Sequence, residues 1–164
     1  MFYTIADLNQ MSQDEFVAAL GAVFEHTPAI AYQTWYQRPF TNVTQLHQQM
    51  VAVVNAMSRG EKLALIQAHP DLGSKAKMAE ASVKEQAGIG LDRLTPEEYD
   101  RFQALNQAYQ DKFGFPFIVA VRNHTKTSIL EAFEHRLQNS AAVGMQGAIA
   151  QINQIAQFRL LELI

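Results

Sequence analysis

The stretch TPEEYDRFQALNQAYQDKFG, residues 95–114, carries the strongest indication of the fold. Thr95 and Glu98 stand in capping-box spacing around a proline at the first helical position. Apolar side chains then recur at steps of three and four as far as Phe113, which is the period of an amphipathic helix. Gly114 follows at the position where a left-handed residue commonly ends a helix. The stretch therefore predicts one long helix.

Helix signals of the same kind recur on both sides of this stretch. Further helices are predicted to begin after the caps Ser12, Thr27, Asn42, Thr125 and Ser140. The helix after Ser12 is expected to include Phe24, and Gly60 is expected to separate the helix after Asn42 from a short one around Leu63 to Gln67. The run 115–121 is apolar without a helical period and contains a proline, so it predicts an extended or irregular buried segment.

Length and composition predict a single domain. A chain of 164 residues with 48% hydrophobic content can enclose one well-shielded core, so we expect one domain spanning 1–164. The helix signals predict an all-α bundle of about six to eight helices. Charged residues make up only 18% of the chain, which favours additional burial against a second subunit in a homodimer.

Charge and residue usage exclude several classes of function. The net charge of −3 arises from interspersed acids and bases without a basic run, so nucleic acid and membrane partners are not expected. The absence of cysteine removes disulfides and thiolate chemistry, and no apolar run approaches the ~20 residues of a membrane span. The first residues do not resemble a secretory signal, and we expect a cytoplasmic protein.

His69 is the first candidate for chemistry. It directly precedes Pro70, whose ring disfavours helical torsions in the preceding residue, so the imidazole is expected on a turn that ends a helix. A side chain at such a turn can point into a pocket. The alternative is that His69 caps the preceding helix or forms a hydrogen bond within the core.

Ser82 and Glu85 form a second candidate pair. Their separation of three residues is also that of a capping box, so they can simply begin a short helix at Val83. In the functional interpretation, Glu85 orients the imidazole of His69 and binds substrate N–H groups. Both interpretations remain open on these residues alone.

Arg159 is the third candidate. It shares a helical face with apolar residues, where an unpaired guanidinium is costly to bury, so it needs an anionic or carbonyl partner. That partner can be a structural carboxylate, a second subunit or a substrate. Arg122 presents the same ambiguity. The histidines show no compact metal-ligand spacing, and no serine lies in a nucleophile-elbow motif, so neither a metal site nor serine hydrolase chemistry is expected.

Three blocks of the sequence together resemble a known family. Residues 68–73 read AHPDLG, residues 82–86 read SVKEQ and residues 113–118 read FGFPFI. In this order and spacing they are similar to the signature blocks of the 2-oxo-4-hydroxy-4-carboxy-5-ureidoimidazoline (OHCU) decarboxylase family. The resemblance extends from Phe40 to Arg159, although the stretch between the first two blocks is shorter than is typical of the family.

The resemblance implies an all-α homodimer that works without a cofactor or a metal. It implies decarboxylation of OHCU to (S)-allantoin in urate degradation. His69, Glu85 and Arg159 are then the catalytic residues. The substrate-binding residues are Pro70, Ser82, Gln86, Phe117, Ile118 and Arg159.

The chemistry of this reaction gives each residue a role. His69 is the natural proton carrier because the reference pKa of histidine lies near ~6.5. Glu85 and Ser82 orient the imidazole and the substrate, and Arg159 is expected to stabilise developing negative charge. Whether His69 or Glu85 delivers the final proton to carbon stays open at this point. Two alternatives remain open: a related ureide hydrolase or isomerase that uses the same pocket, and a helical binding module without catalysis.

Overall fold

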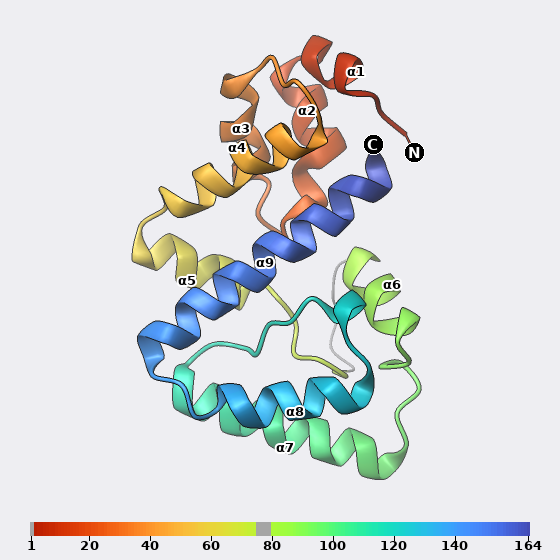
Figure 1. Cartoon of the computed structure of the whole chain (residues 1–164), viewed down its shortest axis with the longest axis vertical. Helices are drawn as coiled ribbons and strands as arrows, with labels where there is room; N and C mark the ends of the chain where they lie inside the picture. The colour runs from red at the N-terminus through yellow and green to blue at the C-terminus, as the bar shows by residue number, and fades with distance from the viewer. Residues whose placement is uncertain (1, 75–79) are drawn as a thin grey trace. The chain divides into compact units, whose positions relative to one another are not determined.

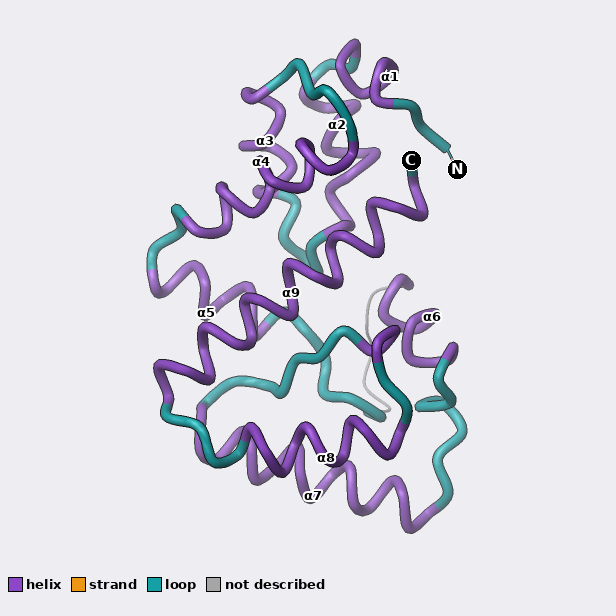
Figure 2. The backbone as a smooth tube through the Cα atoms, in the orientation of Figure 1, coloured by secondary structure: helices purple, strands orange, loops and turns teal. Residues whose placement is uncertain are grey.

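The chain folds entirely from helices in the residues that the structure describes. The computed structural model describes residues 2–74 and 80–164, and these ranges contain nine α-helices, three 3₁₀ helices and no strand (Figure 1, Figure 2). The all-α prediction is confirmed, with slightly more helices than expected. Residues 75–79, which fall within the short stretch between the first two family blocks, lie outside the described residues.

The chain divides into two compact units. Unit 1 comprises Met1–Leu65 and Asn153–Ile164, and unit 2 comprises Ile66–Ile152. The single domain spanning 1–164 remains a prediction. None of the described helices combines the length and hydropathy needed to cross a bilayer.

Unit 1 is built from short capped helices. It contains α1 (Ile5–Gln10), α2 (Gln13–Leu20), η1 (Gly21–Val23), α3 (Ala29–Thr34), η2 (Trp35–Gln37), α4 (Val43–Asn55), most of α5 (Arg59–Gln67) and the C-terminal half of α9 (Ala141–Leu163). Two predicted caps are confirmed. The Ser12 hydroxyl accepts from the Glu15 N–H at 3.2 Å, and Asn42 Oδ1 accepts from the Gln45 N–H at 2.8 Å.

Several predicted details of unit 1 were wrong. Thr4 and Asp7 form a capping box that begins α1, a helix that the sequence analysis did not identify. Phe24 lies beyond α2, because the chain tightens into η1 after Leu20. Thr27 does not cap α3, because its hydroxyl donates to the Glu25 carbonyl at 2.7 Å.

The boundary at Gly60 was also wrong. Gly60 lies in the first turn of α5, and the break from α4 comes earlier, at residues 56–58. The Ser58 hydroxyl accepts from the Glu61 N–H at 3.1 Å, and the Glu61 carboxylate accepts from the Ser58 N–H at 2.9 Å. This capping box, rather than the glycine, sets the start of the helix.

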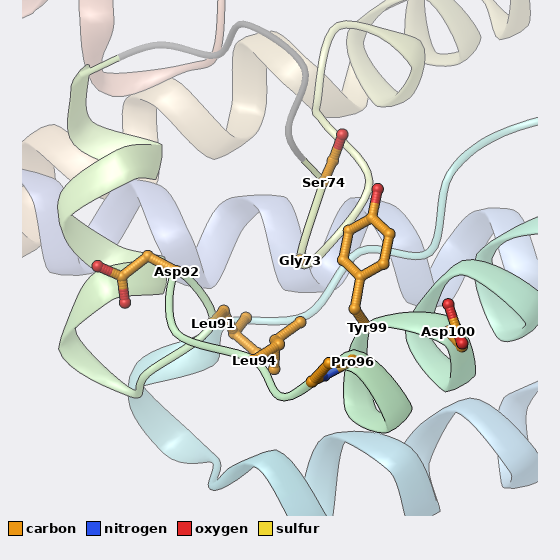
Figure 3. A pocket seen from close by; sticks show the side chains of 8 residues that line it. All are labelled: Gly73, Ser74, Leu91, Asp92, Leu94, Pro96, Tyr99 and Asp100. Atoms are coloured by element: carbon orange, nitrogen blue, oxygen red, sulfur yellow. The ribbon is translucent and has the colours of Figure 1, made fainter.

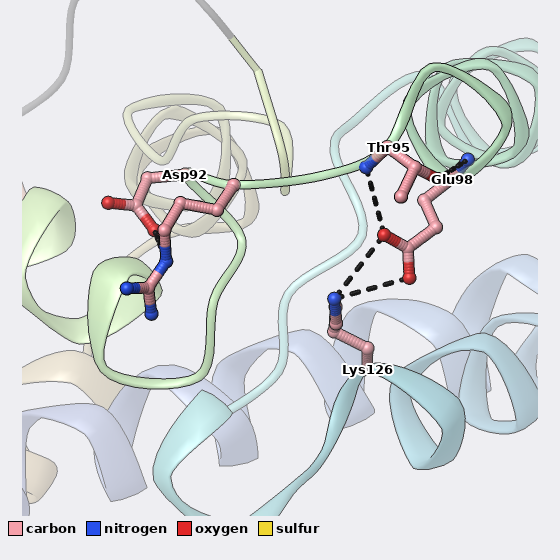
Figure 4. Close-up of polar contacts among 5 residues, drawn as sticks. Asp92, Thr95, Glu98 and Lys126 are labelled. Atoms are coloured by element: carbon pink, nitrogen blue, oxygen red, sulfur yellow. Dashed lines mark hydrogen bonds and ion pairs between the residues drawn. The ribbon is translucent and has the colours of Figure 1, made fainter.

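Unit 2 contains the helix that was predicted most firmly. Its elements are α6 (Glu80–Gly88), α7 (Pro96–Phe113), η3 (Val121–Asn123), α8 (Lys126–Arg136) and the N-terminal half of α9. Thr95 and Glu98 form the expected capping box, and Gly114 ends α7 with a φ of 76°. Figure 4 shows that Glu98 also pairs with Lys126 at 3.2 Å, which joins the N-termini of α7 and α8. Thr125 and Ser140 cap α8 and α9 as predicted.

Aromatic rings fill the core of unit 2. Phe117 stacks on Phe133 of α8 with ring centroids 3.9 Å apart, and Tyr109 of α7 meets Phe117 edge-on at 5.3 Å. All three side chains are fully buried. Residues 115–120 have neither helix nor strand structure and are buried throughout, which confirms the irregular buried segment.

Candidate active site

A short loop places His69 immediately after α5. The helix ends at Gln67, and the backbone N–H of His69 donates to the Ile66 carbonyl at 3.1 Å in the closing turn. The His69 side chain is buried with 8% exposure, and Pro70 is half-buried. The predicted turn at His69 and Pro70 is therefore present, and it carries a buried imidazole.

One face of α6 carries the second group of predicted residues. Ser82, Glu85 and Gln86 follow one another at steps of three and one, which places all three on one side of the helix. Ser82 and Gln86 are buried, Glu85 is half-buried, and the intervening Val83 and Lys84 are exposed. These three polar side chains therefore share the less exposed side of α6.

The capping interpretation of Ser82 and Glu85 was wrong. A cap precedes the first turn of its helix, whereas Ser82 lies two residues inside α6, which extends back to Glu80. Neither side chain is needed to begin the helix. The functional interpretation of Ser82 and Glu85 remains a prediction.

Amide side chains tie the His69 loop to α6 and α7. Gln86 Oε1 of α6 accepts from the Gly73 N–H at 3.0 Å, and Asn106 Nδ2 of α7 donates to the Leu72 carbonyl at 2.8 Å. Both amide side chains are buried. Gln86 was predicted to bind substrate. In the structure its amide oxygen accepts a hydrogen bond that holds the loop after His69.

Residues 113–118, the third of the sequence blocks, also lie in unit 2. Phe117 and Ile118 are both buried, with 0% and 3% exposure, and Gln67 Nε2 donates to the Gly114 carbonyl at 3.2 Å. A few residues beyond this segment, η3 packs against α6. All three sequence blocks thus lie in unit 2, where Gln86 joins the second block to the first, and the third block and the residues just beyond it contact the end of α5 and α6.

Arg159 lies in unit 1, where a carboxylate and two backbone carbonyls surround it. Its Nη1 is 3.7 Å from the Glu25 carboxylate and donates to the carbonyls of Ala22 and Val23 at 3.4 Å each. The side chains of Arg159 and Glu25 are 5% and 0% exposed. The need for an anionic partner is thus met by a structural carboxylate, which the sequence analysis did not identify.

Two further titratable residues, Arg122 and Asp71, lie in unit 2. Arg122 lies on η3 with an exposed side chain, so the burial that motivated its candidacy is not found. Burial raises the pKa of the Asp71 carboxyl in the His69 loop. Among residues 2–74 and 80–164, no three histidine, aspartate or glutamate side chains gather in an arrangement suited to a metal ion.

A cavity of about 320 Å³ borders the His69 loop on the side of Gly73 and Ser74. Figure 3 shows Leu91, Leu94 and Tyr99 around it. None of the predicted site residues is among the residues that line this cavity. The cavity therefore borders the His69 loop but is lined by none of the side chains predicted to act on substrate.

The fold and the buried groups define an all-helical protein with an imidazole, a hydroxyl and a carboxylate supplied by neighbouring segments of one unit. This is the class of arrangement that supports acid–base chemistry. The family model described as OHCU decarboxylase matches residues 9–161, and the chain belongs to this family.

Known relatives match over most of the chain. An OHCU decarboxylase from Halalkalicoccus jeotgali is 44% identical over 160 residues, covering 98% of this chain and 91% of that protein. A putative OHCU decarboxylase from Homo sapiens is 31% identical and is covered to 95%. The uric acid degradation bifunctional protein of Bacillus subtilis is 42% identical, but this chain spans only 33% of its length.

Solved structures agree with the fold. A crystal structure of (S)-allantoin synthase superposes with a TM-score of 0.81 at 34% identity, over 99% of this chain and 54% of that one. A crystal structure of OHCU decarboxylase in the presence of (S)-allantoin gives a TM-score of 0.71 over 93% of this chain and 98% of that one. Its 20% identity makes it a comparison of fold alone.

Proposed function

We propose that this protein decarboxylates OHCU to (S)-allantoin in urate degradation. The observation that carries the proposal is the gathering of the three family blocks in unit 2, with His69, Ser82 and Gln86 buried and Glu85 half-buried. Membership of the OHCU decarboxylase family supports the choice of substrate and reaction.

In the proposed reaction the bond between the ring carbon and its carboxylate breaks and CO2 leaves. The electron pair enters the conjugated C=N and carbonyl system of the substrate, so the substrate supplies its own electron sink. A proton then adds to the ureido-bearing ring carbon, and the face that receives it sets the handedness of the product. The tasks of the protein are orientation, charge stabilisation and delivery of this proton.

We assign the proton transfer to His69 and the orienting roles to α6. Burial at the end of α5 restricts the motion of the imidazole, which favours transfer along one direction. Glu85 is proposed to orient the imidazole and to accept ureido N–H bonds, and Ser82 to add a neutral hydrogen bond. Pro70, Gln86, Phe117 and Ile118 are proposed to bind substrate as the family resemblance implies.

Arg159 is proposed to act on charge that develops during the reaction. A guanidinium that gripped the leaving carboxylate would stabilise the ground state at least as much as the transition state. We therefore assign Arg159 to a ring or ureido oxygen that becomes more negative as CO2 departs. Glu25 supports this role because a paired guanidinium is held in one orientation.

The assembly and location are proposed from the same resemblance. We propose a homodimer that works in the cytoplasm. Exposed apolar side chains supply surface for subunit contact, among them Phe2 with 77% exposure, Tyr36 with 58% and Leu161 with 55%. Sedimentation of the purified chain at two concentrations tests the dimer.

The experiment that tests the function generates the unstable substrate in situ from urate. CO2 release, ultraviolet decay and the circular dichroism of the product are followed with and without the protein. We expect faster decay, one equivalent of CO2 and a single allantoin enantiomer. Faster decay without CO2 release would instead indicate a ureide hydrolase or isomerase. Decay at the rate seen in buffer alone, ending in racemic allantoin, would indicate a helical binding module without catalysis.

A further inference from the structure

Arg136 is a partly buried cation in unit 2 to which the proposed chemistry gives no role. It is the last residue of α8, and its Nη1 donates to the backbone carbonyl of Ile118. Its guanidinium carbon lies 4.3 Å from the centroid of the Phe117 ring, which is close enough for a cation–π contact. One side chain thus contacts two consecutive residues of the segment proposed to line the substrate site.

A second residue of α8 contacts the same ring. Phe133, which precedes Arg136 by three positions on the helix, stacks on Phe117 with the planes inclined by 21°. The ring of Phe117 is therefore held by two side chains from one face of α8. This face fixes the ring, and Arg136 alone also fixes the backbone that follows it.

The bond to the Ile118 carbonyl sets the orientation of a peptide group. A peptide is planar and trans, so the Ile118 carbonyl and the Val119 N–H point in opposite directions. With its carbonyl bound to Arg136, this peptide turns the Val119 N–H away from the guanidinium. The next N–H, that of Ala120, donates to Gln151 Oε1 of α9 at 2.9 Å, so adjacent peptides are both fixed by side chains.

The contact has the strength needed to hold a backbone in place. Hydrogen bonds from a charged donor are roughly twice as strong as neutral ones, and burial strengthens them further. Ile118, Val119 and Ala120 are each at most 4% exposed, so water has little access to compete for the carbonyl. Segment 117–120 has no helix or strand structure, so these side-chain bonds supply backbone restraint that a helix or strand would otherwise provide.

We infer that Arg136 is a positioning residue for the decarboxylation, because it holds the Phe117–Val119 backbone in the one orientation that the substrate meets. The inference rests on the proposed function, in which Phe117 and Ile118 line the substrate site. Arg136 acts through this backbone and touches no reacting atom. Loss of the contact should misplace the substrate relative to the proton donor while the fold persists.

The test compares Arg136→Met with a matched variant. Methionine keeps an apolar stem but cannot donate to the carbonyl. The control is Arg101→Met, because Arg101 pairs with Glu134 on the surface of the same unit and is 52% exposed. Arg136→Lys is the conservative variant, since its ammonium can reach a carbonyl but lacks the planar group that stacks on a ring.

We expect Arg136→Met to lower kcat by about tenfold with a smaller change in KM, since small misplacements carry rate costs of this order. The enantiomeric purity of the allantoin should fall and hydrogen exchange at the Val119 amide should rise. Arg136→Lys should recover part of both effects, and Arg101→Met should match the wild type. Wild-type turnover is measured first, so an inactive wild type counts against the proposed function, while amide exchange still tests the contact.

Two results would overturn the inference. In the first, folded Arg136→Met retains wild-type kcat, enantiomeric purity and Val119 exchange. In the second, Arg136→Met and Arg136→Lys lose stability or fail to fold, while any folded fraction turns over at the wild-type rate. Arg136 would then be a structural residue only.

Discussion

Unit 1 and unit 2 bury their polar side chains in different ways. Unit 1 buries an ion pair, in which Arg159 and Glu25 lie 3.7 Å apart with almost no exposure. Unit 2 buries His69 and Ser82 near amides that hold the backbone, as Gln86 holds Gly73 and Asn106 holds Leu72. The difference teaches that the buried carboxylate of Glu25 in unit 1 requires a compensating charge, whereas the loop after His69 in unit 2 is placed by the neutral hydrogen bonds of Gln86 and Asn106.

The largest expected effect comes from breaking the ion pair of unit 1. Arg159→Met leaves the fully buried Glu25 without its guanidinium, so we expect a loss of about 3–5 kcal/mol in the free energy of unfolding, together with a loss of activity. The double variant Glu25→Gln/Arg159→Met removes both charges and should regain most of the stability but none of the activity. Chemical denaturation and turnover assays measure the two quantities.

The same double variant can also contradict the catalytic role proposed for Arg159. Recovery of activity along with stability would mean that Arg159 serves only to neutralise Glu25, and its proposed catalytic role would be lost.

The next effect comes from the neutral hydrogen bonds of unit 2. Asn106→Ala removes the donor to the Leu72 carbonyl and leaves that carbonyl buried, which should cost about 1–3 kcal/mol. Because Leu72 belongs to the same loop as His69, kcat should fall as well. Thr34→Ala is the control in unit 1: it also removes a buried bond to a carbonyl, here that of Ile30 at 2.7 Å, and should affect stability alone. Equal kcat losses in the two variants would remove the distinction between the units.

A smaller effect concerns pH and spans both units. The pKa values of Asp7, Glu15, Glu61 and Glu98 are lowered, in each case mainly because the carboxylate accepts the backbone N–H of its capping residue. A carboxyl with a lowered folded-state pKa stabilises the fold above its unfolded pKa, and this stability is lost as the pH falls through the folded value. Unfolding should therefore become easier below the ordinary carboxyl range, near ~4.

Of these four carboxylates, Glu98 is the one in unit 2, so a variant at Glu98 tests the acid dependence of that unit. Glu98→Gln should flatten the acid dependence of unit 2 because it also removes the pair with Lys126. Thermal unfolding of wild type and variant between neutral and acid pH provides the measurement. An unchanged acid dependence in Glu98→Gln would show that this capping box contributes nothing to it.

The smallest effect is expected at the cavity of unit 2. Asp100→Asn changes an exposed carboxyl group at its lining that is not among the proposed site residues, so kcat and KM should stay within about twofold of the wild type. Steady-state assays provide the check. A large loss of activity would move the substrate site from the α6 face to this cavity.

Local chemistry made most helices predictable from the sequence. The capping boxes at Ser12 and Thr95 and the glycine at 114 act on neighbouring residues, so their effects are visible in the sequence. The failures were also local: Thr4 was overlooked as a cap, and Gly60 was read as a break although glycine is tolerated in a first turn.

The site was predictable only in part, because its supporting contacts connect residues distant along the chain. His69, Ser82 and Glu85 were predicted as site residues from spacing and resemblance, and they remain predictions. No local pattern pairs Arg159 with Glu25, Asn106 with Leu72 or Arg136 with Ile118, which are 134, 34 and 18 positions apart. Ser82 and Glu85 also have true capping-box spacing, and only the extent of α6 shows that they do not begin it.

The central claim is that His69 carries the proton that decides the handedness of the product. The most direct measurement compares the decay rate and the product circular dichroism of His69→Ala with those of His135→Ala, which alters an exposed histidine on α8. We predict that His69→Ala remains folded, loses about 10²–10⁴ in rate and leaves racemic allantoin, while His135→Ala behaves as the wild type. A folded His69→Ala that still releases a single enantiomer at the wild-type rate would contradict the account.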